Sequence, residues 1–374
     1  MAGLYLHIPF CRRKCHYCNF YSLPTRKYRK EIPKAMMIEM EINQTFFNGE
    51  PLDTIYVGGG TPSLYPPDDI QYLINAAKDN FRFAENVEIT LEANPDDISN
   101  EWIEALSASS VNRLSIGVQS FNDDDLHYLH RIHSASQAIA GIEKARKAGF
   151  GNLSIDLIYG IPGQTDEQWI ENIKMATALK IPHISAYALT VEKGTTLDFL
   201  IKKGKLPSVD DDKAAGQFMI LMQAMSNAGY LHYEISNFAL PGYFSRHNTA
   251  YWNGQKYLGI GPSAHSFDGT TRRWNVSLME NYIRGVYDNS VCYESETLSL
   301  HQLFDEYVMT SLRTMWGCDP AIVKKKFGDM YYNHLMQGIT KWIEKDLLIM
   351  DKGKIILTDQ GKLFADGIAS DLFL

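Results

Sequence analysis

The chain is predicted to be an α/β protein, a partial (β/α)6 TIM-like barrel followed by a mostly helical, winged-helix-like C-terminal domain. Short β-rich runs alternate with helix-like stretches through the first half of the 374 residues. Polar residues fall near the C-terminal ends of several of these runs, where barrel enzymes place their sites. The pattern then changes near residues 200 and 298, which predicts a barrel over 1–200, a barrel extension over 201–297 and a last domain over 298–374.

Six runs are predicted as strands and the stretches between them as helices. The strands span residues 3–8, 52–57, 87–92, 112–118, 152–158 and 183–189. The helices between them include 32–47, 67–80, 134–148 and 167–179. A strand followed by a helix, six times over, indicates parallel β/α units in a barrel or partial barrel.

The alternation within the strands separates a core face from a polar face. Glu92, Gln119 and Asp156 lie on the polar face, opposite the apolar residues that are expected to pack on helices. They stand near the C-terminal ends of their strands. The alternative is that they only satisfy one another inside the barrel.

The second half of the chain is less regular. A predicted helix at 210–228 is followed by an aromatic-rich stretch (230–252) and a glycine-rich stretch (257–267). Helices are then predicted at 300–314, 319–327 and 330–345, followed by a hairpin around Asp351, Lys352 and Gly353. A structural or interaction role for this domain is favoured over DNA binding, because its basic residues are matched by acidic ones.

Composition excludes several classes of protein. The net charge of −8 argues against a nucleic-acid surface, and no apolar run approaches the roughly 20 residues that cross a membrane. The apolar segment 4–10 is short and contains His7 and Pro9, so a signal peptide is not expected and a cytoplasmic location is predicted. Clustered cysteines there indicate metal binding or catalysis, whereas Cys292 and Cys318 are expected to be ordinary thiols.

Three cysteines, Cys11, Cys15 and Cys18, form a C-x3-C-x2-C cluster, and Phe20 stands two residues after the last one. Zinc could be bound if His7 or His16 supplied a fourth ligand. An iron–sulfur cluster with one open iron is the other interpretation. The aromatic residues around the cysteines favour the iron–sulfur cluster, which needs a dry environment.

The segment CRRKCHYC (11–18) resembles the signature of radical S-adenosylmethionine (radical SAM) proteins, and GGGTP (58–62) resembles their glycine-rich contact with the cofactor. The resemblance implies a 4Fe-4S cluster held by the three cysteines, with S-adenosylmethionine chelating the open iron. It also implies an external electron donor and reductive cleavage of the cofactor to a 5′-deoxyadenosyl radical.

Motifs along nearly the whole chain resemble the oxygen-independent coproporphyrinogen oxidase group: LYLHIPFC, YVGGGTPS, EITLEANP, RLSIGVQSF, LHRIHS and SIDLIYGIPGQT. This resemblance implies S-adenosylmethionine contacts at Tyr5, Tyr17, Gly60, Thr61, Pro62, Glu92, Gln119, Arg131 and Asp156. Carboxylates can accept from ribose hydroxyls, and Arg131 can pair with the methionine carboxylate.

The chain departs from the oxidase pattern twice. Phe20 replaces the last cysteine of C-x3-C-x2-C-x-C, and Cys11 comes too early for the oxidase's N-terminal arm. Both features resemble the HemW haem-chaperone branch, as does HNTAYW (247–252). That branch implies haem binding by His247, with Tyr251 and Trp252 packing on the porphyrin, and delivery to an acceptor protein. His265 is a weaker candidate ligand.

Three hypotheses follow. The chain is a haem chaperone of the radical SAM type, a coproporphyrinogen III oxidase, or a zinc protein whose barrel is a scaffold. Stoichiometric haem binding without porphyrinogen turnover would identify the first. Formation of protoporphyrinogen would identify the second, and zinc without iron or sulfide the third.

Overall fold

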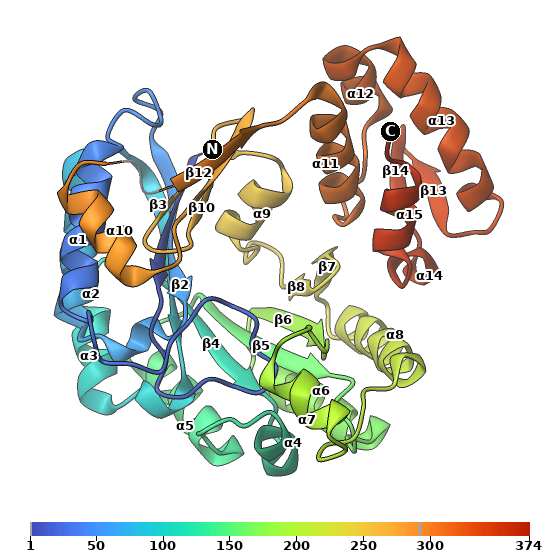
Figure 1. Ribbon diagram of the computed structural model, residues 1–374. Coiled ribbons are helices and arrows are strands. Elements are labelled where there is room, and N and C mark those ends of the chain that lie inside the picture. The colour runs from blue at the N-terminus through green and yellow to red at the C-terminus, as the bar shows by residue number, and fades with distance from the viewer. Residues whose placement is uncertain (1, 291–292) are drawn as a thin grey trace.

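The computed structural model describes residues 2–290 and 293–374, so Cys292 lies outside the described residues. Its centre is a strongly curved sheet with helices on its outer face (Figure 1). Six parallel strands lie side by side in chain order, as predicted: β1 (Ala2–Ile8), β2 (Leu52–Gly59), β3 (Phe83–Ala93), β4 (Arg113–Gln119), β5 (Leu153–Tyr159) and β6 (His183–Ala188).

Antiparallel strands and one further parallel strand extend this sheet at both sides. β8 (Asn237–Ala239) and β7 (Leu231–Glu234) follow β6, and β9 (Lys256–Ile260) pairs in parallel with β1. β10 (His265–Phe267), β11 (Thr271–Asn275) and β12 (Tyr293–Thr297) continue beyond β9. Within the described residues the hydrogen-bonded order runs from β12 to β7 without joining its two ends, as a partial barrel requires.

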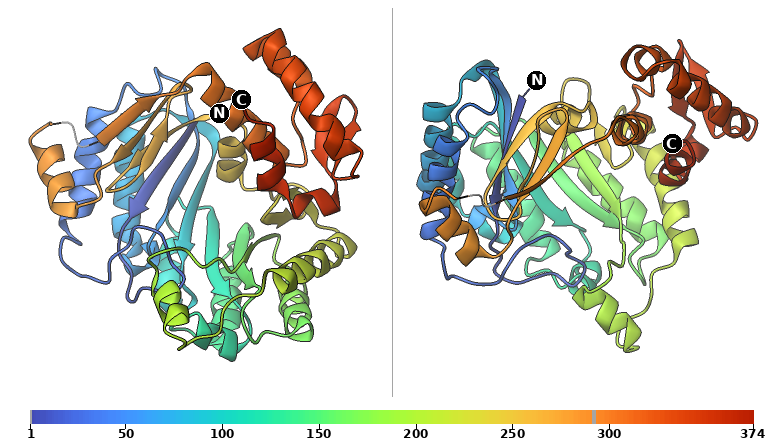
Figure 2. Two further views of the ribbon diagram at one scale, coloured as in Figure 1. Left: turned by 45° about the vertical axis from the view of Figure 1, so that its right-hand side comes forward. Right: turned by 45° about the horizontal axis from the view of Figure 1, so that its top comes forward.

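The helices that connect the parallel strands cover the outer face of the sheet (Figure 2). They are α1 (Glu31–Ile42), α2 (Pro67–Asn80), α3 (Asn100–Ser107), α4 (Asp123–Tyr128), α5 (Ala135–Lys147) and α6 (Asp166–Ala178). Two more helices, α7 (Thr196–Lys202) and α8 (Asp211–Asn227), follow β6 and lead to β7. The predicted helix 32–47 was wrong at its end. α1 stops at Ile42, and residues 43–49 form turns that place the Phe47 side chain in the core. None of the helices in the described ranges is long and apolar enough to cross a membrane.

The strand alternation predicted from the sequence separates the two faces of the sheet. Leu4, Leu6 and Ile8 of β1 are fully buried on the outer face under the helices, while Tyr5 and His7 face inward. Parallel strands need both faces covered, and here the inner face is covered by a loop, by α9 (Arg246–Trp252) and by the residues around two cavities. The inner face therefore has the space that ligands would need.

The C-terminal residues form a second unit with its own hydrophobic cluster. It contains α11 (Leu300–Leu312), α12 (Pro320–Phe327), α13 (Asp329–Ile343), α14 (Asp359–Lys362), α15 (Ala365–Asp371) and the hairpin β13 (Leu348–Asp351) and β14 (Lys354–Leu357). The three predicted helices and the hairpin are thus present. Cys318 is fully buried in this cluster, as an ordinary thiol should be. α10 (Met279–Tyr287) packs instead on α1, at the other side of the molecule (Figure 1).

Candidate functional site

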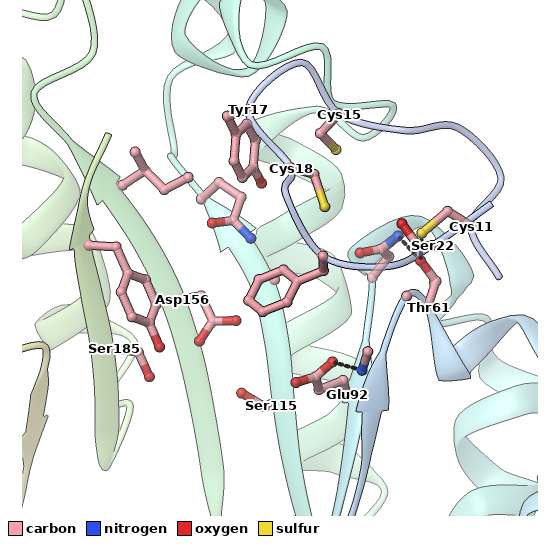
Figure 3. Close-up of a pocket in the computed structure, with 18 of the residues that line it drawn as sticks. Cys11, Cys15, Tyr17, Cys18, Ser22, Thr61, Glu92, Ser115, Asp156 and Ser185 are labelled. Carbon is pink, nitrogen blue, oxygen red and sulfur yellow. Dashed lines mark hydrogen bonds between the residues drawn. The ribbon is translucent and has the colours of Figure 1, made fainter. Parts of the chain in front are cut away.

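A cavity of about 610 Å³, here called the cluster cavity, lies inside the curved sheet beneath the cysteine loop (Figure 3). It brings together residues from β1 to β6 that are far apart in the sequence. Cys11, Cys15 and Cys18 line it, together with all nine residues that the resemblance implied as cofactor contacts: Tyr5, Tyr17, Gly60, Thr61, Pro62, Glu92, Gln119, Arg131 and Asp156.

The three cysteines are half-buried, and two of their sulfur atoms accept hydrogen bonds. Thr61 Oγ1 donates to Cys11 Sγ at 3.5 Å, and Arg131 Nη1 donates to Cys15 Sγ at 3.6 Å. Burial raises the pKa of the Cys18 thiol. Donors directed at the sulfurs suit thiolate ligands, because they stabilise negative charge on sulfur.

The cysteine loop is held against the strand ends by backbone hydrogen bonds. Leu23 N donates to Pro9 O at 2.9 Å and Leu197 N donates to His16 O at 2.8 Å. Gly60 lets the second loop approach, since a Cβ there would lie 2.5 Å from the carbonyl oxygen of Phe10. The glycine in GGGTP thus fits the loop against β1, which places Thr61 beside Cys11.

The two carboxylates of the cavity stand on β3 and β5, below the cysteines in Figure 3. Glu92 accepts from Tyr56 O–H at 2.7 Å and from Gly59 N at 3.1 Å. Burial raises the pKa of Glu92 to about 7 and that of Asp156 to about 6. Both side chains can therefore exchange a proton near neutral pH and accept hydrogen bonds from a bound hydroxyl group.

Arg131 is fixed in the cavity wall. Its Nη2 donates to Asn94 Oδ1 at 2.9 Å and to Gly117 O at 2.7 Å, while its Nε is buried without a hydrogen-bond partner. Gln119, beside it at the end of β4, adopts the left-handed conformation with φ of 67°. A strained backbone and an unused donor at one place are typical of a ligand site.

A second cavity of about 630 Å³, here called the histidine cavity, lies between β1, β9 and α9. His247, Tyr251 and His265 line it, as do the basic residues Lys256 and Arg272. Trp252 is placed elsewhere: its ring packs under the guanidinium of Arg313, 5.1 Å away. The structure therefore groups His247 with Tyr251 and His265, and leaves Trp252 out of that wall.

Several contacts fix His247 at the start of α9. Glu88 Oε1 accepts from the backbone N–H groups of Arg246 and His247, at 3.0 and 3.2 Å, which caps the helix. The ring Nδ1 lies 2.9 Å from Thr54 Oγ1. Gly3 leaves room for the ring, since a Cβ there would lie 3.3 Å from His247 Cε1. Burial lowers the pKa of His247 to about 4, so the imidazole is neutral at pH 7.

One wall is common to the two cavities. Tyr5, Asn19 and Phe20 line both of them, and Phe20 is 72% exposed, which is unusual for so large an apolar side chain. The residue that replaces the fourth cysteine of the oxidase pattern therefore stands between the two spaces.

Sequence reasoning missed several residues of these sites. Tyr56 binds Glu92 and lies 5.1 Å, ring to ring, from His247. Thr54 binds the His247 ring and Glu88 caps its helix. The alternation of β2 gives the signal that could have found the first two, because Thr54 and Tyr56 share the inward face with Gly58.

The histidines considered for zinc are engaged elsewhere. His7 Nδ1 lies 3.0 Å from Tyr5 Oη and its Nε2 lies 2.9 Å from Tyr21 O, so both ring nitrogens are occupied. The His16 ring stacks on His130 with 4.1 Å between centroids. Within residues 2–290 and 293–374, no three His, Cys, Asp or Glu side chains meet closely enough to hold one metal ion.

The chain resembles known proteins at two levels. The radical SAM superfamily profile matches residues 5–176. Over almost its whole length the chain is 36% identical to "Heme chaperone HemW" of Lactococcus lactis, which covers 96% of this chain and 93% of that protein. It is 34% identical to "Heme chaperone HemW" of Bacillus subtilis, with 98% of each chain covered.

More distant relatives agree with this placement. "Radical S-adenosyl methionine domain-containing protein 1, mitochondrial" of mouse is 34% identical over 84% of this chain and 74% of that protein. Among solved structures, coproporphyrinogen III oxidase (HemN) of Escherichia coli superposes with a TM-score of 0.85 at 24% identity, covering 100% of this chain and 90% of that one. That likeness shows the fold.

The radical SAM family implies a 4Fe-4S cluster and S-adenosylmethionine, and the residues present fit both. Three thiols with directed donors suit the cluster, while the buried acceptors Glu92 and Asp156 and the unused Nε of Arg131 suit a polar cofactor. Matches over nearly the full length, at 33–36% identity to HemW proteins, place the chain in a narrower group within that superfamily. The chain belongs to the radical SAM superfamily and, within it, to the HemW family.

Proposed function

We propose that this chain is a haem chaperone, which binds haem in the histidine cavity and passes it to an acceptor protein. The observation that carries the proposal is a neutral, helix-anchored histidine in a cavity beside the cysteine loop, in a chain of the HemW family. The chain is 33–36% identical to the HemW proteins but only 24% identical to the oxidase structure. Its family membership therefore argues against coproporphyrinogen oxidation.

His247 has the properties of a haem-iron ligand. Its imidazole is neutral at pH 7, so no proton has to leave before it binds a metal. With Nδ1–H donated to Thr54 Oγ1, Nε2 keeps its lone pair for the iron. Tyr251 offers an aromatic surface and Lys256 offers positive charge for a haem carboxylate, while Arg272 in the same wall is paired with Glu306 at 2.6 Å.

In the cluster cavity, Cys11, Cys15 and Cys18 would hold the 4Fe-4S cluster, and the nine residues named above would surround S-adenosylmethionine. When bound, this pair supplies one-electron reductive chemistry, for which an external electron donor is needed. Thr61 and Arg131 donate to the sulfurs, Arg131 orients a carboxylate, and Glu92 and Asp156 hold hydroxyl groups.

The proposal also assigns the parts of the chain. Residues 1–200 form the radical SAM partial barrel, residues 201–297 the extension with the haem-contact segment, and residues 298–374 the domain that supports contact with other proteins. The separate hydrophobic cluster of the last part supports this division. We place the activity in the cytoplasm, where thiols stay reduced.

The test is a haem titration of the anaerobically reconstituted protein. Wild-type protein should bind about one haem per chain with a Soret shift, and His247→Ala should lose at least about tenfold in affinity while keeping its iron and sulfide. His127→Ala is the control and should keep the wild-type affinity, because it removes an exposed histidine that lines neither cavity. Haem loss from loaded wild-type protein to an apo haem protein should follow saturable kinetics.

The same samples decide between the alternatives. Assays for 5′-deoxyadenosine and porphyrin products should show no porphyrinogen decarboxylation. Haem affinity unchanged in His247→Ala, conversion of coproporphyrinogen III, or zinc in place of iron and sulfide would each contradict the proposal.

A further inference from the structure

The cluster cavity extends well below the cysteine loop, to the N-terminal ends of β4, β5 and β6. Its lower part is lined by Arg113, Ser115, Ser154, His183 and Ser185, here called the barrel floor. Arg113 begins β4 and Gln119 ends it, so their backbones are roughly 20 Å apart at about 3.3 Å per residue. Figure 3 shows Ser115 and Ser185 on the opposite side of the cavity from Cys15.

Arg113 is buried without a counter-charge. It is 2% exposed, its Nη1 makes one long hydrogen bond of 3.4 Å to Asn152 Oδ1, and its Nε is buried with no partner. Among the described residues, no carboxylate forms an ion pair with Arg113 within 4.0 Å. Asp156 lies farther away, and the positive charge of Arg113 only partly offsets the rise in the pKa of Asp156 that burial causes. A buried charge without a partner is costly, and it persists in a cavity wall where a ligand supplies the partner.

Arg313 shows how this chain treats an arginine that is structural. It is bound by Glu234 at 3.1 Å and by Asp366 at 2.8 Å, and it packs on the ring of Trp252. Arg313 has its anions within the chain, whereas Arg113 faces a cavity.

The Ser154 hydroxyl is available for the same ligand, whereas the Ser115 and Ser185 hydroxyls are hydrogen-bonded to Asp156. Tyr233 accepts from Ser245 N, so its O–H is free to donate to His183 Nε2 at 2.7 Å. With the proton on Nδ1, His183 donates to Ser154 Oγ at 2.7 Å, and the Ser154 O–H is then left to donate to a ligand in the cavity that this residue lines. Burial lowers the pKa of His183 well below its usual value, so this relay is neutral.

A second orphaned group lies on the neighbouring strand. Thr90 of β3 stands directly opposite Arg113 in the sheet register, and its Oγ1 is buried without a hydrogen-bond partner. Two unsatisfied groups on adjacent strands are a feature that a folded interior normally avoids. Of the two, Arg113 lines the cluster cavity and Thr90 does not, so the Arg113 guanidinium is the group that meets a polar ligand brought in from outside.

We propose that the barrel floor binds the carboxylate of a small organic acid, which Arg113 holds through its guanidinium with help from the Ser154 hydroxyl. This ligand is distinct from haem, which we place in the histidine cavity, and from S-adenosylmethionine, whose implied contacts Gln119 and Arg131 lie at the other end of β4. Asp156, another implied contact, accepts from Ser115 and Ser185 and so lies between the two ligands. A carboxylate is favoured over a phosphate because the cavity already contains Glu92 and Asp156, and one guanidinium balances one negative charge.

The test uses the anaerobically reconstituted full chain and measures its melting temperature with succinate, propionate, inorganic phosphate or chloride at equal ionic strength. Succinate and propionate should raise the melting temperature of wild-type protein by about 2 °C over chloride. Arg113→Gln should abolish this rise. Ser154→Ala, which keeps the charge and removes one donor, should reduce it.

The variants without added acid provide a second readout. Arg113→Gln should melt at or above the wild-type temperature, because it removes an unpaired buried charge. Arg313→Gln, the matched control, should melt lower, because it leaves Glu234 buried without its partner. Iron content and haem affinity should be unchanged in Arg113→Gln.

Four results would overturn the proposal. An Arg113→Gln protein that is destabilised as much as Arg313→Gln would make the guanidinium structural. A carboxylate-induced rise that persists in Arg113→Gln, or no rise in wild-type protein, would remove the site. A larger rise with phosphate than with either carboxylate would show that the ligand class is wrong.

Discussion

Two of the cysteine sulfur atoms are contacted by single donors from outside the cysteine loop. Thr61 Oγ1 reaches Cys11 and Arg131 Nη1 reaches Cys15. Hydrogen bonds to sulfur stabilise the reduced, more negative state of an iron–sulfur cluster and so raise its reduction potential. At the scale of single residues, these two donors therefore set part of the reduction potential of the proposed cluster.

Thr61→Val tests this adjustment, because valine keeps the shape of the buried side chain and removes its hydroxyl. The reduction potential of the reconstituted cluster should fall by on the order of tens of millivolts. The measurement is a redox titration followed by electron paramagnetic resonance. Thr190→Val is the control, since Thr190 lines the same cavity but donates to Ala188 O. A potential that shifts equally in both variants would contradict the argument.

Phe20 offers an apolar face to the histidine cavity at 72% exposure. A porphyrin in that cavity would bury the ring, and burying a phenylalanine contributes about 1.5–3 kcal/mol. Phe20→Ala should therefore weaken haem binding about tenfold or more, measured by titration, while the iron and sulfide content stays at the wild-type level. Leu278→Ala, which removes an exposed side chain outside both cavities, should leave the affinity unchanged.

The sequence predicted which residues gather in the cluster cavity, because motif positions at the ends of parallel strands must meet at one edge of the sheet. It was less successful with Trp252, since residues next to each other on a helix point in different directions and Tyr251 already faces the histidine cavity. Arg113 was missed for a different reason: its significance lies in the partners that it lacks, and a sequence does not show them.

At the scale of secondary-structure elements, one buried carboxylate joins α1 to the extension of the sheet. Glu39 is 4% exposed and accepts from Gly261 N at 2.8 Å, from Asn275 Nδ2 at 2.6 Å and from Tyr282 O–H at 2.6 Å. Burial raises its pKa to about 7 despite these three donors. The folded state thus holds a proton on Glu39 at a pH where the unfolded chain does not.

This gives stability a defined pH dependence. Because the folded pKa is raised, the contribution of Glu39 is complete below about pH 4.5 and is lost as the pH rises through about 7. The free energy of unfolding of the wild type relative to Glu39→Gln should fall by about 3 kcal/mol between pH 4 and pH 8. Urea denaturation at several pH values measures it. The exposed Glu31→Gln on the same helix should track the wild type throughout.

Element prediction worked where the periodic pattern was long. The six parallel strands and α2 were found because alternation or a helical repeat persists over several turns or residues. β7, β8, β9, β10 and β11 have three to five residues each and pack at the margins of the sheet, so their pattern is too short to detect. Their position is set by tertiary pairing with β6 and β1.

At the scale of the whole molecule, the barrel and the C-terminal unit have separate hydrophobic clusters and meet through Ile235 and a polar junction. Arg313 is the centre of that junction. It binds Glu234 of β7, whose side chain is 1% exposed, and Asp366 of α15, and it packs on Trp252 of α9. One side chain thus joins the C-terminal unit to the sheet and to the helix that carries His247.

Arg313→Gln should be one of the more damaging single substitutions outside the cores. It leaves the Glu234 carboxylate buried without its cation, which in such pairs costs about 3–5 kcal/mol. Guanidinium denaturation followed by near- and far-ultraviolet circular dichroism measures the loss, and limited proteolysis should cut earlier between α10 and α11. Lys324→Ala breaks an exposed pair with Asp329 in the same unit and should cost less than about 1 kcal/mol. Equal losses in the two variants would show that the junction contributes no more than a surface ion pair.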